Sequence, residues 1–425
     1  MESKVLKQIL LEQSKARELE KLGTTRARLA EIEAVLPLAH VVIVTGIRRS
    51  GKSTLLRQAA NKHYGTDFYY IDFEDERLMD FSVRDFNTLY EVFIELYGLK
   101  TVFFFDEVQN IPDWELYVRR MHREKNKFFI TGSNANLLSS ELATKLTGRH
   151  VVIELLPFSF KEYLHYQGVQ YSKQSFLISQ EKALLRRAFN DYVEHGGMPE
   201  FLEYKNPIIL QTIYENIIYK DIIVRYQIKA VKALRKLALF LISNAGTLIS
   251  YSKLKNILSL GSINTVKDFV HYLENAYLIL TLDRFSFSVG EQTTAPKKVY
   301  CVDTGLARHI GFQFSLNIGK YLENVVYLEL RRRYKELYYY RTKENLEVDF
   351  LVRQGSKIVL LVQVTQSMLD EKVRQRELKA LILAMQELKQ GTPAYILTVD
   401  EEEEIKTEMG TIFVLPIDKW LLEIV

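Results

Sequence analysis

The chain has 425 residues, which is enough for about three domains of ordinary size, and its 47% apolar and 26% charged residues are typical of a folded protein. A net charge of +4 is too small to indicate a partner class, and a single cysteine, Cys301, excludes an intrachain disulfide. The sequence shows no signal peptide and no apolar stretch long enough to cross a bilayer, so we expect a cytoplasmic protein that does not contact membranes.

The predicted elements divide the chain into five parts. Residues 1–36 have helical periodicity, and residues 37–157 alternate short apolar runs with helical patterns, which predicts a parallel sheet covered on both faces. Residues 158–230 are predicted to be helical, and 231–305 to form three helices followed by two strands. In 306–425 we expect a helix (320–334), strands (337–342, 346–352 and 357–364), a helix (369–387), a strand (393–399) and a solvated loop, "DEEEE".

The segment "VVIVTGIRRSGKSTLL" (41–56) is a strand that leads through a glycine-bounded loop into a helix. Gly46, Gly51, Lys52 and Ser53 fit G-x-x-x-x-G-K-[ST], in which backbone N–H groups curl round phosphates at a helix N-terminus. Lys52 is expected to neutralise the β- and γ-phosphates, and Ser53 to bind Mg²⁺. The candidate cofactor-binding residues in this loop are Gly46, Arg48, Arg49, Ser50, Gly51, Lys52, Ser53 and Thr54.

A second apolar strand, "TVFFFDEVQ", ends in two carboxylates. Asp106 and Glu107 are therefore expected at the carboxyl edge of the sheet, where ligands bind. Asp106 is predicted to hold Mg²⁺ directly or through water, and Glu107 to polarise the attacking water. A helix-capping acidic pair is the alternative, which the phosphate loop disfavours.

Two further candidates for catalysis follow the next strand. Asn134, in "ITGSNA", is a candidate to orient the water or touch the γ-phosphate; an ordinary N-cap is the alternative. Arg149, in "TGRHVVIEL", is a candidate arginine finger acting on a neighbouring subunit, which requires a homo-oligomer; a surface arginine is the alternative.

Taken together, the loop, "FFFDE", "TGSN", "TGR", "LLPFSFKEYL" and "GGMPEFL" resemble an archaeal and bacterial family of AAA+-related ATPases with a winged helix and a C-terminal PD-(D/E)XK nuclease-like domain. The resemblance spans nearly the whole chain. It implies an α/β fold made of a P-loop NTPase core (37–157), a helical lid (158–230), a winged helix-turn-helix (231–305) and a nuclease-like domain (306–425), with ATP and Mg²⁺ as cofactors. It makes Pro199, in "GGMP", a candidate adenine contact; a proline after a glycine C-cap is the alternative.

Basic residues concentrate in one part of the chain: residues 229–298 carry ten Lys/Arg and four Asp/Glu, a net charge of +6. The second helix of this part is predicted to bury Ile263, Val266, Phe269, Val270 and Leu273. Its outer face and the wing would then contact double-stranded DNA through Asn264, Thr265, Lys267, His271, Lys297 and Lys298. A winged helix that only packs against the ATPase is the alternative.

The nuclease-like resemblance extends to Glu323 and Asp349, but the third strand carries Gln363 and Thr365 where Glu-x-Lys is expected. Metal-assisted hydrolysis needs anionic ligands and a nearby cation. Lys357 and Arg341 are the candidates to replace that cation. We expect a vestigial site that serves binding or scaffolding; retained nuclease activity is the alternative.

These residues favour an enzyme that hydrolyses ATP to ADP and thereby drives or gates the movement of DNA-binding and nuclease-like domains. A slow nucleotide-dependent switch that acts on a protein partner is one alternative, and an ATP-gated DNA nuclease is another.

Overall fold

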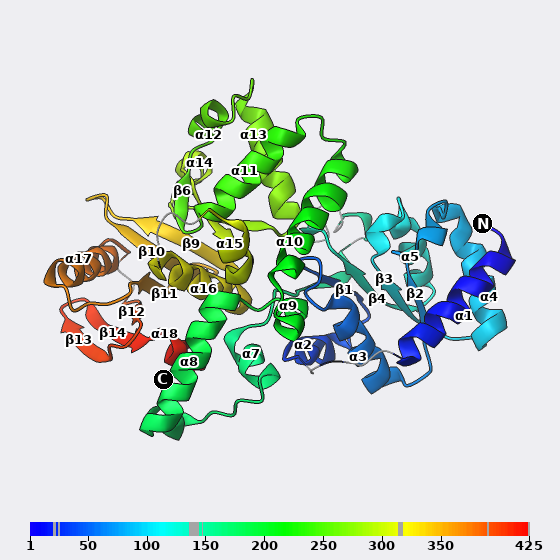
Figure 1. Cartoon of the computed structure of the whole chain (residues 1–425), viewed down its shortest axis with the longest axis horizontal. Helices are drawn as coiled ribbons and strands as arrows, with labels where there is room; N and C mark the ends of the chain where they lie inside the picture. The colour runs from blue at the N-terminus through cyan, green and yellow to red at the C-terminus, as the bar shows by residue number, and fades with distance from the viewer. Residues whose placement is uncertain are drawn as a thin grey trace. The chain divides into compact units, whose positions relative to one another are not determined.

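The computed structural model describes residues 1–19, 23, 26–135, 144–146, 148–312, 318–388 and 391–423. These residues form two compact units: Met1–Leu156 with Asn275–Tyr277, and Pro157–Glu274 with Leu278–Val425 (Figure 1). In the described part of the chain, no helix is both long and apolar enough to span a bilayer.

The first unit is built on a five-stranded parallel sheet, as the alternating apolar runs predicted. The strands are β1 (Val41–Thr45), β2 (Tyr69–Asp72), β3 (Val102–Asp106), β4 (Lys127–Gly132) and β5 (His150–Glu154), in the order β2-β3-β4-β1-β5. All five residues of β1 and of β3 are buried, because helices cover both faces of the sheet. This strand order, with a phosphate loop directly after β1, is that of a P-loop NTPase.

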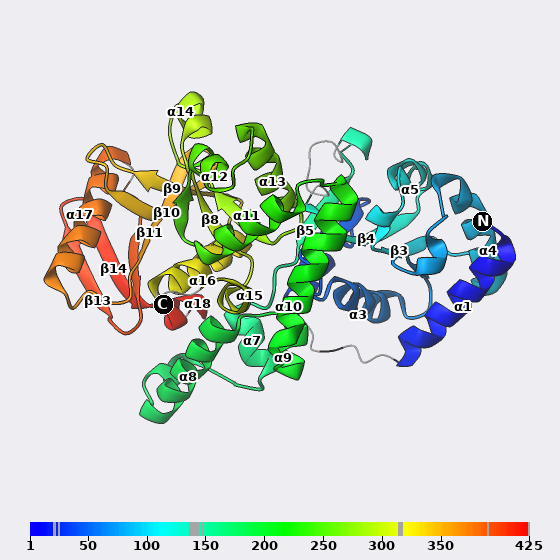
Figure 2. The same ribbon diagram turned by 45° about the horizontal axis from the view of Figure 1, so that its top comes forward.

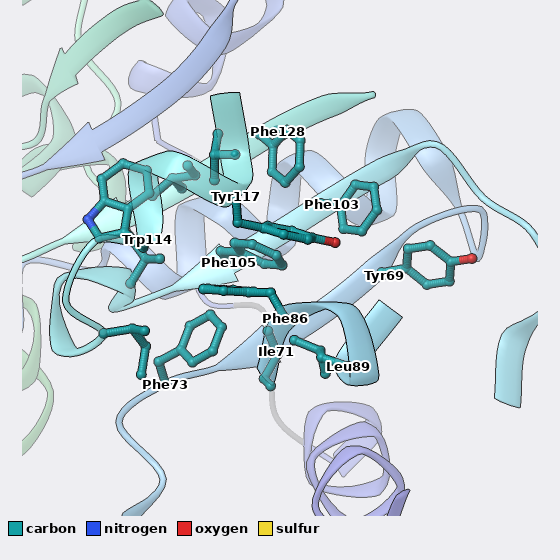
Figure 3. Packing of buried hydrophobic residues seen from close by; sticks show 14 of the residues in the cluster. Tyr69, Ile71, Phe73, Phe86, Leu89, Phe103, Phe105, Trp114, Tyr117 and Phe128 are labelled. Atoms are coloured by element: carbon teal, nitrogen blue, oxygen red, sulfur yellow. The ribbon is translucent and has the colours of Figure 1, made fainter. Parts of the chain in front are cut away.

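Helices pack on both faces of this sheet. Side chains from α1 (Ser3–Leu19), α4 (Phe86–Tyr97) and α5 (Trp114–Arg123) share one apolar cluster with the strands, and those from α2 (Arg28–Val35) and α3 (Lys52–Tyr64) share the other. Figure 3 shows the first cluster, where aromatic rings of α4 and α5 lie against those of the strands. Phe86 and Tyr117 stack with ring centroids 4.5 Å apart.

The second unit begins with helices, as predicted. They are α7 (Phe160–Tyr166), α8 (Ser179–His195), α9 (Pro199–Tyr204), α10 (Pro207–Asn216) and a π-helical turn, Ile217–Val224. Gly197, before α9, has to be glycine, because a Cβ there would lie 2.3 Å from the carbonyl oxygen of Phe158. Its N–H donates a 2.7 Å hydrogen bond to Asp303.

A small antiparallel sheet and its helices follow. The elements are α11 (Val231–Ser243), β6 (Thr247–Ile249), α12 (Tyr251–Ile257), α13 (Ile263–Asn275), β7 (Ile279–Leu282), α14 (Val289–Thr294) and β8 (Lys297–Cys301), with strand order β6-β8-β7. The sequence analysis missed β6 and α14, which are only three and six residues long. It also placed Ile263 in the core, but this first residue of α13 is 38% exposed; the other four predicted core residues of the helix are buried.

The last part of the chain forms a six-stranded mixed sheet. Its elements are α15 (Thr304–Ile310), α16 (Ile318–Arg333), β9 (Glu336–Arg341), β10 (Glu347–Gln354), β11 (Lys357–Val364), α17 (Glu371–Leu388), β12 (Ala394–Thr398), β13 (Glu403–Thr407), β14 (Gly410–Pro416) and α18 (Ile417–Leu421). The order is β13-β14-β12-β11-β10-β9, and α16 and α17 lie on opposite faces (Figures 1 and 2). The expected helix, three strands, helix and strand are confirmed. The prediction of a solvated loop at 400–404 is wrong in part, because Glu403 and Glu404 begin the edge strand β13. The exposed side of an edge strand tolerates such charges.

Candidate functional site

The loop after β1 has the backbone geometry of a phosphate cradle. Gly46 has a φ of +154°, and a Cβ there would lie 2.1 Å from the carbonyl oxygen of Leu155; Gly51 has a φ of +92°. Only glycine meets both conditions without strain. The Ser50 hydroxyl, inside the loop, is buried without a hydrogen-bond partner among the described residues, which suits a loop that receives polar ligand atoms.

Four predicted residues meet where β1 and β3 end. Lys52 begins α3, is 4% exposed, and donates a 3.2 Å hydrogen bond to the carbonyl oxygen of Ile47. Its Nζ lies 3.4 Å from Glu107 Oε1. Ser53 Oγ donates a 3.0 Å hydrogen bond to Asp106 Oδ1. The serine and aspartate expected to hold Mg²⁺ are therefore adjacent, and the lysine lies beside the expected base.

Asp106 is held by groups that the sequence analysis missed. The carboxylate is 1% exposed and accepts hydrogen bonds from Tyr70 Oη at 2.7 Å and from Thr131 Oγ1. Burial raises the pKa of Asp106, and the neighbouring Glu107 raises it further. Thr131 is the second-last residue of β4, which pairs with β3, and this position near the strand end was the signal for it. Tyr70 gave no signal, because its register with Phe104 is known only from the folded sheet.

Glu107 lies just beyond β3 in a left-handed conformation, with a φ of 49°. Its N–H donates a 2.9 Å hydrogen bond to Thr131 Oγ1, and its carboxylate accepts one from Gln109. Burial raises the pKa of Glu107, but Lys52, Gln109 and Arg48 outweigh burial and lower it. The side chain is therefore ionised at neutral pH and able to accept a proton.

Arginines surround the loop. Arg48 pairs with Glu74 at 2.6 Å, and Arg49 is exposed with a φ of 66°. Arg26, which the sequence analysis missed, is 5% exposed and donates hydrogen bonds to the carbonyl oxygens of Ser50 and, at 2.9 Å, of Leu156. It lies 24 residues before the serine that it supports, so no local pattern indicated it.

Three predicted contacts remain predictions. Asn134 is 8% exposed and its carbonyl oxygen accepts a 3.0 Å hydrogen bond from Thr45; most of the segment that it would cap lies outside the described residues. Arg149 is exposed and precedes β5, at the opposite edge of the sheet from the loop, about 16 Å away along the strand. It is out of reach of its own loop, so action on a neighbouring subunit and the alternative of a surface arginine both stay open. Pro199 is the first residue of α9, in the second unit.

The second unit contains a different charged cluster, at Glu323 and Asp349. Lys298 Nζ lies 2.9 Å from Glu323 Oε1, 2.9 Å from Asp349 Oδ1 and 2.8 Å from Glu347 Oε1. Lys298 is only 2% exposed. The prediction that it meets DNA phosphate from the wing is therefore wrong, since its ammonium faces inward and is fully paired. Glu347, which the sequence analysis missed, stands two residues before Asp349 on the same strand.

Local backbone irregularity places Asp349 in this cluster. The pairing of β9 with β10 shifts by one residue between Val348 and Leu351, so Asp349 lies in a bulge that redirects its side chain. Its Oδ2 accepts a 3.0 Å hydrogen bond from the N–H of Val364, and its own N–H donates to Gln363 Oε1 at 3.2 Å. The structure thus brings Glu323, Asp349 and Gln363 together as predicted.

Of the two proposed substitutes for the missing cation, only Arg341 contacts the cluster. Lys357 is exposed at the start of β11, and Arg341 Nη2 lies 3.5 Å from Glu347 Oε2. Burial, followed by the charge of Asp349, raises the pKa of Glu323 to about 7. Burial lowers the pKa of Lys298, but its anionic neighbours outweigh burial and raise it well above its usual range. The ammonium is therefore charged.

The predicted outer face of α13 is accessible. Asn264, Lys267 and His271 are exposed and Thr265 is half-buried, whereas Lys297 lies 3.0 Å from Asp283 Oδ1. Lys267 Nζ lies 5.8 Å from the centre of the Tyr251 ring. Contact of this face with DNA remains a prediction.

Comparison with known proteins matches three successive parts of the chain to three protein families. Residues 39–164 match an AAA domain, and residues 186–319 and 318–420 match two domains of unknown function, DUF8612 and DUF4143. The uncharacterized protein MJ1544 of Methanocaldococcus jannaschii is 34% identical over 438 residues, 99% of this chain and 97% of that protein. An uncharacterized protein of Haemophilus influenzae is 32% identical over 76% of this chain and 82% of its own length.

Solved structures resemble the chain only distantly. The Aeropyrum pernix Orc1 protein in complex with DNA aligns at 13% identity with a TM-score of 0.30, covering 68% of this chain and 92% of that one. AMPPCP-bound DnaA from Aquifex aeolicus aligns at 17% identity with a TM-score of 0.26, covering 59% and 89%.

Proposed function

Because this chain belongs to the same family as MJ1544 and carries an AAA domain at residues 39–164, we propose that it is an ATPase that hydrolyses ATP with Mg²⁺. One observation supports this most strongly. The loop lysine, the helix serine and both strand-end carboxylates converge at a single point, with Ser53 Oγ 3.0 Å from Asp106 and Lys52 Nζ 3.4 Å from Glu107.

Each residue has a chemical role in this proposal. The backbone N–H groups of the loop and Lys52 would bind the phosphates, and Ser53 and Asp106 would hold Mg²⁺, which neutralises developing negative charge when bound. Glu107 is the general base, since it is ionised and anchored by Thr131 and Gln109 beside the loop. Asn134 is proposed to orient the water, and Arg149 to complete the site of a neighbouring copy.

The Glu107→Gln variant tests this assignment. We expect it to bind ATP as the wild type does and to hydrolyse it at least about 100-fold more slowly, because the amide cannot accept the proton. Glu124→Gln, at the exposed end of α5, is the matched control and should retain wild-type turnover. Normal turnover by Glu107→Gln would assign the base to another group.

We propose further that ATP turnover is coupled to DNA binding by residues 231–305. The order α11-β6-α12-α13-β7-α14-β8 supports a winged helix-turn-helix interrupted by the short helix α14, and α13 presents Asn264, Lys267 and His271 to solvent. Pro199 and the helices of residues 158–230 would act as the lid that senses the nucleotide.

Duplex binding measured against salt concentration tests this coupling. Phosphate contacts make the logarithm of affinity fall with the logarithm of salt, and Lys267→Ala should lower that slope by about 1. Lys406→Ala, on the exposed edge strand β13, should leave the slope unchanged. Affinity that is weak and insensitive to salt would remove DNA from the proposal.

The main alternative is a slow switch that acts on a protein partner. ATPase rates with and without duplex DNA separate the two: stimulation supports coupling to DNA, whereas slow turnover that ignores DNA and retains ADP supports the switch. The ATP-gated nuclease is disfavoured, because Lys298 occupies the acidic cluster and Gln363 and Thr365 supply no charge.

A further inference from the structure

Lys298 donates hydrogen bonds to two carboxylates, of Glu323 and Asp349, and forms an ion pair with a third, that of Glu347. An ammonium group has three N–H donors, and three carboxylates from two elements surround this one: Glu323 from α16, and Glu347 and Asp349 from β10. All three N···O distances are 2.8–2.9 Å, and the two hydrogen bonds to Glu323 and Asp349 are charge-assisted.

These carboxylates do not fit a divalent metal in this arrangement. Mg²⁺ needs oxygen ligands at about 2.0–2.1 Å, so it would have to stand where the Lys298 ammonium stands. Elsewhere in the cluster, the Gln363 carbonyl oxygen is already bonded to the N–H of Asp349. Among the described residues, no group of three or more His, Cys, Asp or Glu side chains is arranged to hold a metal ion.

The strand that carries Lys298 is bound to α16 along its length. Tyr300 Oη donates a 2.7 Å hydrogen bond to Glu323, and its ring stacks on that of Tyr327, with centroids 4.0 Å apart. The N–H and carbonyl oxygen of Cys301 both bond the side chain of Asn324, at 2.8 and 2.9 Å. The ammonium is thus one of several contacts that join β8 to the C-terminal sheet.

We propose that Lys298 takes the place of a divalent metal ion among Glu323, Glu347 and Asp349 and fastens the β6-β8-β7 sheet to the C-terminal sheet, so that residues 306–425 have no nuclease activity. Every residue in this assignment lies between β8 and β11, so it does not depend on ATP hydrolysis.

Thermal unfolding of the full chain, without nucleotide, tests the replacement. Lys298→Met removes the ammonium but keeps most of the side-chain volume, and it leaves three carboxylates facing one another. We expect the Tm to fall by roughly 5–10 °C. Lys297→Met, at the adjacent and more exposed lysine, is the matched control and should lower the Tm by at most about 1 °C.

Millimolar Mn²⁺ then distinguishes a metal position from an ordinary salt bridge. It should restore at least half of the lost Tm in Lys298→Met and leave the wild type and Lys297→Met unchanged. The triple variant Lys298→Met, Glu323→Gln, Asp349→Asn should regain stability without Mn²⁺ and lose the response to it. If Lys298→Met does not fold, the triple variant still tests the charge balance, since it should fold.

Three outcomes would overturn the proposal. They are a Lys298→Met variant as stable as Lys297→Met, a destabilised Lys298→Met that Mn²⁺ does not restore, and metal-dependent DNA cleavage by the wild type that Asp349→Ala abolishes.

Discussion

Among the described residues, Lys52 and Lys298 are both buried beside carboxylates, and they differ in how many anions surround them. Lys52 is 4% exposed, contacts one backbone carbonyl oxygen, and has one carboxylate at 3.4 Å. Lys298 is 2% exposed and has three carboxylates within 2.9 Å. The first ammonium keeps capacity for another anion, whereas the second has none left.

This difference shows why burial alone does not identify a catalytic lysine. A buried charge must be compensated, and the compensation comes either from the protein or from a ligand. Next to Lys52 the Ser50 hydroxyl has no partner in the described chain, and the glycine conformations hold the loop open to a bound group. Next to Lys298 every position is taken.

The largest expected effect is on ATP affinity, when each of the two lysines is replaced in turn by methionine. Lys52→Met should weaken ATP binding by about 1,000-fold, or about 4 kcal/mol, because it removes a charge-assisted contact to the phosphates. Lys298→Met should bind ATP within about twofold of the wild type. Isothermal titration calorimetry on both variants measures this difference in affinity. Equal losses of ATP affinity in the two variants would contradict the distinction between the two lysines.

Adding a fourth carboxylate to the saturated cluster should also be costly. Gln363→Glu places a negative charge next to Asp349 and the buried Glu377, which we expect to lower the free energy of unfolding by about 3 kcal/mol. Urea unfolding measures the change. Gln354→Glu, at the exposed end of β10, is the control. If Gln363→Glu has the same free energy of unfolding as the control, the cluster can accept a further negative charge without destabilisation.

The raised pKa of Glu323 makes the stability of the second unit depend on pH. Its folded value of about 7 lies above the ordinary 4.5, so its contribution is present at low pH and is lost as pH rises through 7. Between pH 5.5 and 8.5 the loss should be about 2 kcal/mol. Glu323→Gln should remove that part of the pH dependence, which unfolding curves at several pH values will show.

The smallest effect is expected at Tyr70, one of the groups that hold Asp106. Tyr70→Phe removes one hydrogen bond to this carboxylate and should slow ATP turnover about fivefold, or about 1 kcal/mol. Tyr69→Phe removes a hydroxyl that donates to the carbonyl oxygen of Gly98, away from the loop, and should leave turnover unchanged. Identical rates for the two variants would show that Tyr70 does not position Asp106.

The nucleotide site could be predicted because its residues are local. Gly46, Gly51, Lys52 and Ser53 lie within eight positions, and Asp106 and Glu107 end an apolar strand, so parallel pairing brings them to one edge. Tyr70 was not predicted because its contact with Asp106 depends on the register of β2 with β3, and Arg26 was not predicted because it lies 24 residues before Ser50.

The acidic cluster was predicted only in part, for the same reason. Glu323 and Asp349 came from a resemblance, whereas the partner Lys298 is 51 residues from Asp349 and was assigned to an exposed face. A signal was available: Lys298 lies in "KKVYC", where the next three residues are buried. A lysine inside such a strand needs an internal partner.

The attachment of β8 also determines where the chain can be divided. Cutting after Leu156 separates the two units except for Asn275–Tyr277, which belong to the first unit. The sequence predicted a domain boundary after Gly305. A cut there would leave Lys298 in one fragment and its carboxylates in the other, and it would separate Cys301 from Asn324. We therefore expect each half, expressed alone, to expose unpaired polar groups and to aggregate, and residues 231–305 and 306–425 to fold only together.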